Sequence, residues 1–479
     1  MEKEKQEEAH NSLRDNYLSN PFWDWILHFM QKIDLKNTPI PKLFFSYFIP
    51  SLITMLALST YSTIDGIFVG RKLGDDALAA IGIAWPIFPL IIGFELLLSF
   101  GGGTLVSYYI GKGKPYKARA IFSSAFYFAF VVSLSCGLLC FVFTEEIARA
   151  LGASARLESL VVDYLRVVFL GMVFIALHPL SDVFAINDKK PMLATFSMII
   201  SAISNVFLNY LFLFVLDWGI SGSALATILA HMIGLLVLLQ HFLRGRGDLF
   251  FIRAFSLRGI FIAARAGLPQ CSAELSAAVV MFLFNTTLMG IAGERGVAIY
   301  SILMYSGIVF FTLLISVAQG MQPIASFSHG AGLFGRVREV FGFSFVVACV
   351  VGVLLYTLAY LWGENLVWLF LGEGHAGDEV FVAEVVHAMR IYYFGYIFLG
   401  INILTAVFLQ SLQRTRASFV LTLFYTLGFV AVLLPLFSHY FGQNGAWLSY
   451  PSAQFLSLFV VVAVLLVERK HFCEVKNDK

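Results

Sequence analysis

Two stretches of the sequence, far apart in the chain, determine its architecture. Residues 101–119 read GGGTLVSYYIGKGKPYKAR, and residues 320–338 read GMQPIASFSHGAGLFGRVR. Both have glycine at the first and eleventh positions and end in arginine, and they lie 219 residues apart. Other landmarks repeat at an offset of 219 residues and then, beyond an insertion of five residues, of 224: Pro50 with Pro269, Arg166 with Arg390, and Gly171 with Gly395. The chain is therefore a tandem duplication.

Composition places this duplicated chain in a membrane. Its 479 residues are 59% hydrophobic and 13% charged, with a mean hydropathy of +0.82, which is beyond the apolar share of an ordinary soluble domain. The apolar residues form long runs, and about 20 such residues span a hydrocarbon core as a helix. We predict an all-α membrane protein with twelve transmembrane helices, near 42–70, 77–110, 117–144, 158–186, 191–216, 220–243, 262–290, 297–328, 337–362, 380–410, 416–438 and 445–467.

Each repeat contains six predicted spans, and an even number gives both repeats the same orientation in the membrane. We expect two parallel six-helix lobes related by an axis along the membrane normal, at 42–243 and 262–467. A linker at 244–261 joins them, and an N-terminal segment at 1–41 and a tail at 468–479 flank them. Two similar lobes around a cavity can rock between inward-open and outward-open states, so the duplication favours a transporter.

The placement of basic residues predicts the orientation, although the net charge of +2 does not. The loops after even-numbered spans hold fifteen Lys and Arg, whereas the loops after odd-numbered spans hold only Arg71, Lys72, Arg149, Arg156 and Arg295. Because positive residues are retained on the cytoplasmic side, we expect both termini in the cytoplasm and the protein in the inner (plasma) membrane.

The N-terminal segment lacks the pattern of a signal peptide, since residues 1–20 are charged and no small-residue cleavage site follows an apolar core. Apolar residues recur at helical spacing between Phe22 and Ile33, which predicts a short interfacial helix or a regulatory segment. The five Cys are scattered without a CxxC pair, so the sequence indicates neither a disulfide framework nor a zinc site.

Few ionisable residues lie inside the predicted spans, and such residues are costly there unless they face protein or water. Asp65 lies late in the first span, and Tyr61 lies one helical turn before it. Asn205 and Asn209 have the same spacing on the fifth span, and Thr227 adds a hydroxyl from the sixth. These side chains supply the hard oxygens that an alkali cation prefers.

Several motifs identify a family. Residues 64–70 (IDGIFVG), 77–80 (ALAA), 219–227 (GISGSALAT), 319–324 (QGMQPI) and 330–332 (GAG) resemble, in their order and spacing, the multidrug and toxic compound extrusion (MATE) family. The resemblance runs over about residues 42–468 and is strongest to the branch of bacterial and archaeal drug exporters. It implies cation-coupled antiport, in which H⁺ or Na⁺ moves inward while an organic, often cationic and amphipathic, compound is exported.

The resemblance also places Tyr61, Asp65, Asn205, Asn209 and Thr227 around the cation site of that family. Position 209 departs from the pattern, because the family has a carboxylate there and this chain has Asn. Two neighbouring carboxylates resist ionising together and so hold a proton near neutral pH. Asp65 lacks that partner, which leaves the choice between H⁺ and Na⁺ open.

Other polar residues of the spans have two interpretations each. Glu95 and Glu274 are candidates for lining a substrate cavity, or else hydrogen-bonded acids of the interior. His178 and His231 are expected to be polar interior residues, and no spacing of His, Cys and Asp suggests a transition metal. Five prolines lie inside predicted spans, as hinges or fixed kinks: Pro50, Pro86, Pro179, Pro269 and Pro323.

Two other functions are weaker alternatives. A flippase for lipid-linked saccharides or an exporter of a natural metabolite shares this architecture, but a pyrophosphate cargo requires basic residues in the cavity. A membrane-embedded transferase requires acids or His at one membrane face, for which only the loop at 363–379 is a candidate. The sequence contains no phosphate-binding P-loop. We expect a monomeric transporter, not an enzyme, that contacts a small organic substrate and membrane lipid, binds no nucleic acid and needs no cofactor besides its coupling ion.

Overall fold

The computed structural model describes residues 34–370 and 379–473, and the side chains of residues 59–63, 75, 369–370 and 469–473 are not described. The interfacial helix predicted near residues 22–33 lies outside this part of the chain. The described residues form helices and no strand, because apolar runs of this length satisfy their backbone groups in a bilayer only as helices.

The first repeat comprises eight helices. They are α3 (Ile40–Leu73), α4 (Asp75–Ala84), α5 (Ile87–Gly111), α6 (Pro115–Val142), α7 (Thr144–Ala150), α8 (Glu158–Asn187), α9 (Pro191–Tyr210) with a π-helical continuation η1 (Leu211–Val215), and α10 (Gly219–Leu243). The span predicted at 77–110 is interrupted, because α4 ends at Ala84 and Pro86 precedes the first residue of α5. Proline has no N–H to continue the hydrogen-bond ladder.

The second repeat comprises α11 (Leu257–Gly330), α12 (Phe334–Phe370), α13 (Glu379–Tyr392), η3 (Tyr393–Gly395), α14 (Tyr396–Ser411), α15 (Thr415–Leu423), η4 (Phe424–Gly428) and α16 (Phe429–Cys473). Helix α11 contains two predicted spans that meet at Gly293 (φ 62°). The span predicted at 416–438 runs through α15 and η4 into α16, where it meets the last predicted span at Gly442 (φ 57°). Only glycine adopts such a positive φ at little cost. Ten described helical segments are long and apolar enough to cross a membrane, and these two breaks bring the passes to the predicted twelve.

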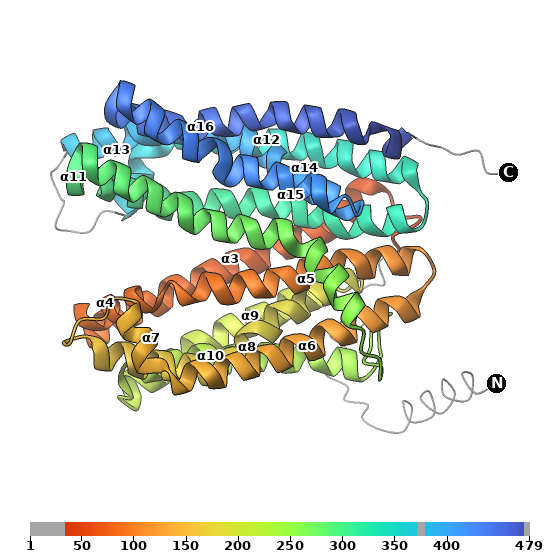
Figure 1. Ribbon diagram of the computed structural model, residues 1–479, viewed down its shortest axis with the longest axis horizontal. Coiled ribbons are helices and arrows are strands. Elements are labelled where there is room, and N and C mark those ends of the chain that lie inside the picture. Colours follow the sequence, from red (N-terminus) through yellow and green to blue (C-terminus); the bar gives the residue numbers. More distant parts are fainter. Residues whose placement is uncertain (1–33, 371–378, 474–479) are drawn as a thin grey trace.

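The two lobes lie side by side, and each contributes the start of its first helix to the other (Figure 1). Leu43, Phe44 and Tyr47 of α3 belong to the apolar core of the second repeat. In the same way, Ile260 near the start of α11 belongs to a core of the first repeat. The equivalent helices of the two repeats therefore cross between the lobes in the same manner.

The repeated glycines lie where the lobes touch. A Cβ atom at Gly111 would overlap the carbonyl oxygen of Phe327, and one at Gly330 would overlap that of Tyr108. Helices α5 and α11 therefore meet backbone to backbone, which only glycine allows at these positions. This contact explains why both repeats carry glycine at the positions that revealed the duplication.

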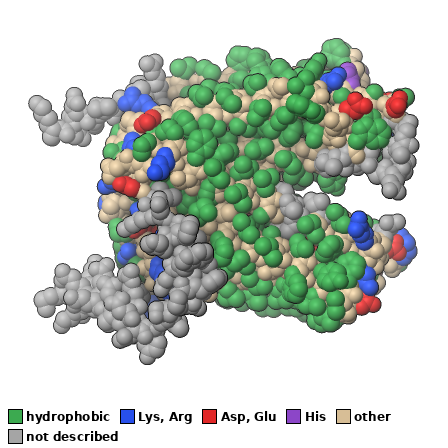
Figure 2. All heavy atoms as spheres, turned by 180° about the vertical axis from the view of Figure 1, so that it is seen from behind, with side chains coloured by type: hydrophobic (Ala, Val, Ile, Leu, Met, Phe, Trp, Pro, Cys, Tyr) green, Lys and Arg blue, Asp and Glu red, His purple; other side chains and the backbone are tan. Residues whose placement is uncertain are grey.

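The lobes close at one end and separate at the other. At the closed end, Oδ1 of Asn187 on α8 accepts hydrogen bonds from Oγ of Ser107 on α5 at 2.7 Å and from Nε2 of Gln322 on α11 at 3.2 Å. Figure 2 shows a hollow between the two halves at the opposite end, where α4 and α7 lie in Figure 1. On the face drawn in Figure 2, a cleft between the lobes therefore opens at this end.

Candidate functional site

The predicted cation site lies inside the N-terminal lobe, where α3, α9 and α10 pack together. Oγ of Ser223 on α10 donates a 2.8 Å hydrogen bond to Oδ1 of Asp65 on α3. The side chain of Asn209 on α9 faces the same carboxylate, yet neither of its polar atoms has a hydrogen-bond partner within the described part of the chain. Asp65, Ser223 and Asn209 thus form one layer of the site.

A second layer lies one helical turn away. Nδ2 of Asn205 donates a 3.2 Å hydrogen bond to Oγ1 of Thr227, while Oδ1 of Asn205 is buried and has no partner among the described residues. The layers follow from the connection of α9 to α10 by a short turn, since residues 205 and 209 of one helix then face residues 227 and 223 of the other. Helical neighbours four residues apart share a face.

The structure therefore brings together four of the five predicted residues, Asp65, Asn205, Asn209 and Thr227. The fifth, Tyr61, lies on α3, but its side chain falls outside the described residues. Ser223 is an addition that the sequence argument missed. Its position four residues before Thr227 placed it on the same face of the helix, so the signal was present in the motif at 219–227.

The acids proposed for a substrate cavity lie where the lobes meet. Glu95 is on α5 and Glu274 on α11, and the two are close enough for their charges to interact. Glu95 is only 6% exposed, and its Oε1 has no hydrogen-bond partner in the described chain. A buried carboxylate of this kind is unfavourable when it is charged and unpaired. The pair therefore suits a proton or a positively charged group.

Asp182 is a further interior acid, which the sequence argument missed because it lies near the end of the predicted fourth span. It is 4% exposed, lies within electrostatic reach of Glu95 and is one turn from His178 on α8. His178 in turn is hydrogen-bonded to His231 of α10. The two histidines are buried polar residues, as expected from the sequence.

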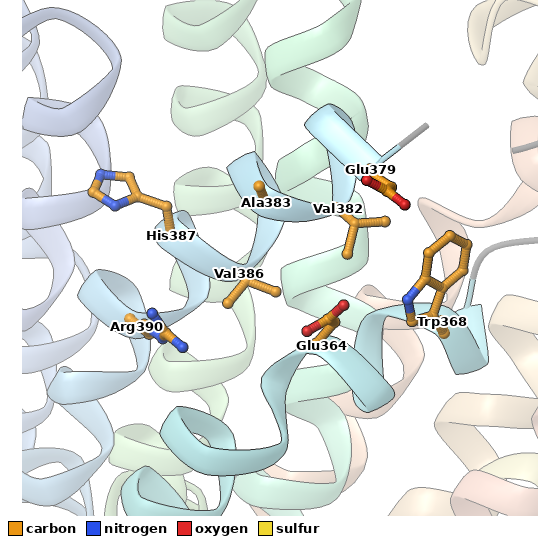
Figure 3. Close-up of a pocket in the computed structure, with 8 residues that line it drawn as sticks. All are labelled: Glu364, Trp368, Glu379, Val382, Ala383, Val386, His387 and Arg390. Atoms are coloured by element: carbon orange, nitrogen blue, oxygen red, sulfur yellow. The ribbon is translucent and has the colours of Figure 1, made fainter. Parts of the chain in front are cut away.

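A separate cavity of about 680 Å³ lies in the C-terminal lobe, between α12 and α13. Glu364 and Trp368 come from α12, whereas Glu379, His387 and Arg390 come from α13 (Figure 3). This is the acidic region considered for a transferase. Glu373 and Asp378 lie outside the described residues, and the guanidinium of Arg390 packs on the ring of Tyr360, 4.7 Å from its centre.

Known proteins share the sequence pattern of this chain. The profile of the MatE family matches residues 50–211 and 271–436, which cover most of both repeats. The multidrug export protein MepA of Staphylococcus saprophyticus is 23% identical over 424 residues, with 88% of this chain and 91% of that protein covered. MepA of Staphylococcus haemolyticus is 24% identical over 455 residues, with 92% of this chain and 98% of that protein covered.

Solved structures share the fold. A multidrug resistance MATE family transporter of the MOP superfamily, in an outward-facing conformation, superimposes with a TM-score of 0.85 at 20% identity, covering 92% of this chain and 98% of the other. A MOP superfamily transporter from Pyrococcus furiosus gives a TM-score of 0.83 at 20% identity with the same coverage. The two-lobe fold, the interior site and the match over both repeats agree with the motifs in the sequence, and the chain belongs to the MatE family of multidrug and toxic compound extrusion transporters.

Proposed function

We propose that this protein is a secondary antiporter that exports organic, cationic or amphipathic compounds in exchange for H⁺ or Na⁺ by alternating access. The observation that supports this proposal most is Asp65, a carboxylate inside the N-terminal lobe that faces Ser223 and Asn209. An ionisable group at this depth is retained for a function by default. Multidrug export by the MepA proteins agrees with this proposal.

Both candidate ions fit the oxygen-rich site. Asp65 binds a proton directly, whereas Na⁺ would be held by the carboxylate together with the carbonyl oxygens of Asn205 and Asn209 and the hydroxyls of Ser223 and Thr227. The unpartnered oxygens of both Asn side chains are available for such a role. Because the site has a single carboxylate, either ion brings it to neutrality.

The cleft between the lobes suits cationic cargo. Glu95 and Glu274 place two carboxyl groups and no basic group of their own where α5 and α11 meet, which favours a positively charged or neutral compound over a lipid pyrophosphate. We place the closed end in the cytoplasm, because the basic loops at 112–119 and 189–190 lie there with the linker. The protein then acts as a monomer in the plasma membrane with both termini in the cytoplasm.

Transport by purified protein in proteoliposomes tests this function. Ethidium, a fluorescent planar organic cation, serves as the probe, and a proton gradient and a sodium gradient are imposed separately. We expect one of the two gradients to drive ethidium against its own gradient, and dissipation of that gradient to stop the movement. No ethidium movement under either gradient, at protein levels that bind ethidium, would show that the chain is not such an antiporter.

A further inference from the structure

A buried polar cluster in the N-terminal lobe takes no part in the site around Asp65. It contains His178 and Asp182 of α8, Ser197 of α9 and His231 of α10, and each of these side chains is at most 6% exposed. Polar groups buried among apolar helices are unfavourable unless they bond with one another. The hydrogen bonds among these four side chains therefore indicate which of their atoms carry protons.

The hydrogen bonds of the cluster determine where its protons lie. Oγ of Ser197 donates its only proton to the carbonyl oxygen of Gly234, 2.9 Å away, because a carbonyl can only accept. Nε2 of His178, 2.8 Å from the same Oγ, must then be the donor of that bond. In neutral His178, Nδ1 consequently accepts a hydrogen bond from Nδ1–H of His231 at 3.1 Å. The two imidazoles thus share one proton between their facing nitrogens.

Asp182 lies beside His178 and provides a proton acceptor at the end of this series of hydrogen bonds. Its Oδ2 lies 3.5 Å from Nε2 of His178. Ser197 also faces Asp182, but its proton is directed to Gly234, and neither oxygen of Asp182 accepts a hydrogen bond from a described residue. A buried carboxylate without a donor is unfavourable when charged, so Asp182 is suited to take a proton from His178.

Gly234 allows the imidazole of His178 to pack closely against helix α10. A Cβ atom at position 234 would overlap the imidazole of His178. Glycine therefore lets the ring lie directly against the backbone of α10, where Ser197 also reaches the carbonyl of residue 234. The same residue holds both the imidazole and the hydroxyl in place.

The cluster lies between the two acidic sites described above. His231 follows Thr227 by one turn of α10, about 6 Å along the helix, on the same face. On the other side, Asp182 interacts electrostatically with Glu95 of α5, and Glu95 with Glu274 of α11. Within the cluster itself, His231 acts electrostatically on His178. Polar residues thus lead from the Asp65 site to the cleft.

We propose that His231, His178 and Asp182 form a proton relay between the Asp65 site and the Glu95–Glu274 pair. A proton that binds Nε2 of His231 releases the proton on Nδ1 to Nδ1 of His178. The resulting imidazolium of His178 donates its Nε2 proton to Oδ2 of Asp182. Each imidazole binds one proton and releases one, so both end neutral and Asp182 ends protonated. The relay rests on the proposed antiport and assigns its coupling ion as the proton.

Two transport assays on the full chain in proteoliposomes test the relay. The first measures ethidium efflux driven by a proton gradient, and the second measures ethidium counterflow, in which labelled and unlabelled ethidium exchange without net proton movement. The variants are His178→Gln, Asp182→Asn and His231→Gln, each of which keeps hydrogen-bonding atoms but cannot pass a proton. His439→Gln is the matched control, because His439 is exposed and distant in sequence from the cluster.

We expect each relay variant to lose about a hundredfold or more of proton-driven efflux, the lower end of the range for a positioned proton-transfer group, while counterflow stays within about twofold of wild type. His439→Gln should retain both activities. Unchanged proton-driven efflux in His178→Gln and Asp182→Asn would overturn the relay, and so would a parallel loss of efflux and counterflow in all three variants.

Asp65→Asn separates the two proposals. If it blocks proton-driven efflux while the relay variants do not, the relay alone is wrong. Full activity in Asp65→Asn would refute the coupling site itself.

Discussion

At the scale of the residue, the site contains a single carboxylate, Asp65. Two neighbouring carboxylates would bind a proton more tightly, because their negative charges repel each other. Asn209 faces Asp65, and Asn209→Asp would place a second negative charge beside it. Because like charges at this distance resist ionising together, the pair should bind a proton more tightly than Asp65 alone. We expect gradient-driven ethidium efflux by Asn209→Asp to extend to higher pH if protons drive transport, or to lower sodium concentration if Na⁺ does. Efflux profiles identical to wild type in both titrations would show that residue 209 is not part of the site.

Ser223 is the donor to Asp65, and its removal should change the affinity of the site for its ion. A hydrogen bond to a charged group contributes about 1.5 to 3 kcal/mol and favours the ionised carboxylate, so Ser223→Ala should raise the proton affinity of Asp65 roughly tenfold or more if protons are coupled. If Na⁺ is coupled, the loss of a hydroxyl ligand should lower the sodium affinity instead. The measurement is the proton or sodium concentration that gives half-maximal ethidium efflux. Ser221→Ala is the matched control, because Ser221 lies on the same helix and donates to the carbonyl oxygen of Asp163 instead. Equal shifts in the two variants would argue against a role for Ser223.

At the scale of the element, the linker between the lobes is attached to the N-terminal lobe. Oδ2 of Asp188, just after α8, lies 2.7 Å from Nε2 of His241, and its Oδ1 accepts a hydrogen bond from the backbone N–H of Leu249 at 2.9 Å. Burial raises the pKa of Asp188, while His241 and Leu249 act against this shift.

Breaking this contact should loosen the linker. Asp188→Ala would leave the buried imidazole of His241 and the N–H of Leu249 without this acceptor. An unsatisfied buried polar group costs about 1 to 3 kcal/mol, so we expect Asp188→Ala to lower the apparent Tm of the protein in detergent. Asp248→Ala removes only the half-exposed pair with Lys189 and should leave the Tm nearly unchanged. An unaltered Tm in Asp188→Ala would mean that the linker is held by its other contacts, such as Arg119 with the backbone of Asp248.

The helices also show which features of the fold could be predicted from the sequence. Hydrophobic runs predicted all twelve passes, because a bilayer requires about 20 apolar residues per helix. The break at Trp85–Pro86 was not assigned, since a run of apolar residues continues through it. The turn at Gly293 falls in the gap predicted between the spans at 262–290 and 297–328. Within the site, the sequence predicted which residues share one face of a helix, but it did not predict which residues of different helices are in contact. Asp182 and Ser223 interact with residues on other helices. No local sequence pattern specifies such interactions.

At the scale of the whole molecule, alternating access requires the closed end to open. Asn187 and Gln322 come from different lobes and are hydrogen-bonded there. A disulfide formed in the double variant Asn187→Cys and Gln322→Cys should hold that end closed, stop ethidium transport and release it again on reduction. Each single variant serves as the control. Full transport by the oxidised double variant, with the crosslink confirmed by mass spectrometry, would mean that the lobes do not separate at this contact.

The central claim is that Asp65 couples the two lobes to an ion gradient. The most direct measurement compares gradient-driven ethidium efflux and ethidium counterflow of wild type and Asp65→Asn, reconstituted at matched protein levels. Asparagine preserves the size of the side chain and its bond with Ser223 but cannot carry the charge that binds H⁺ or Na⁺. We predict that gradient-driven efflux falls at least about tenfold in Asp65→Asn while counterflow persists. Efflux at the wild-type rate in Asp65→Asn would contradict the account and move the coupling site to Glu274 and Glu95.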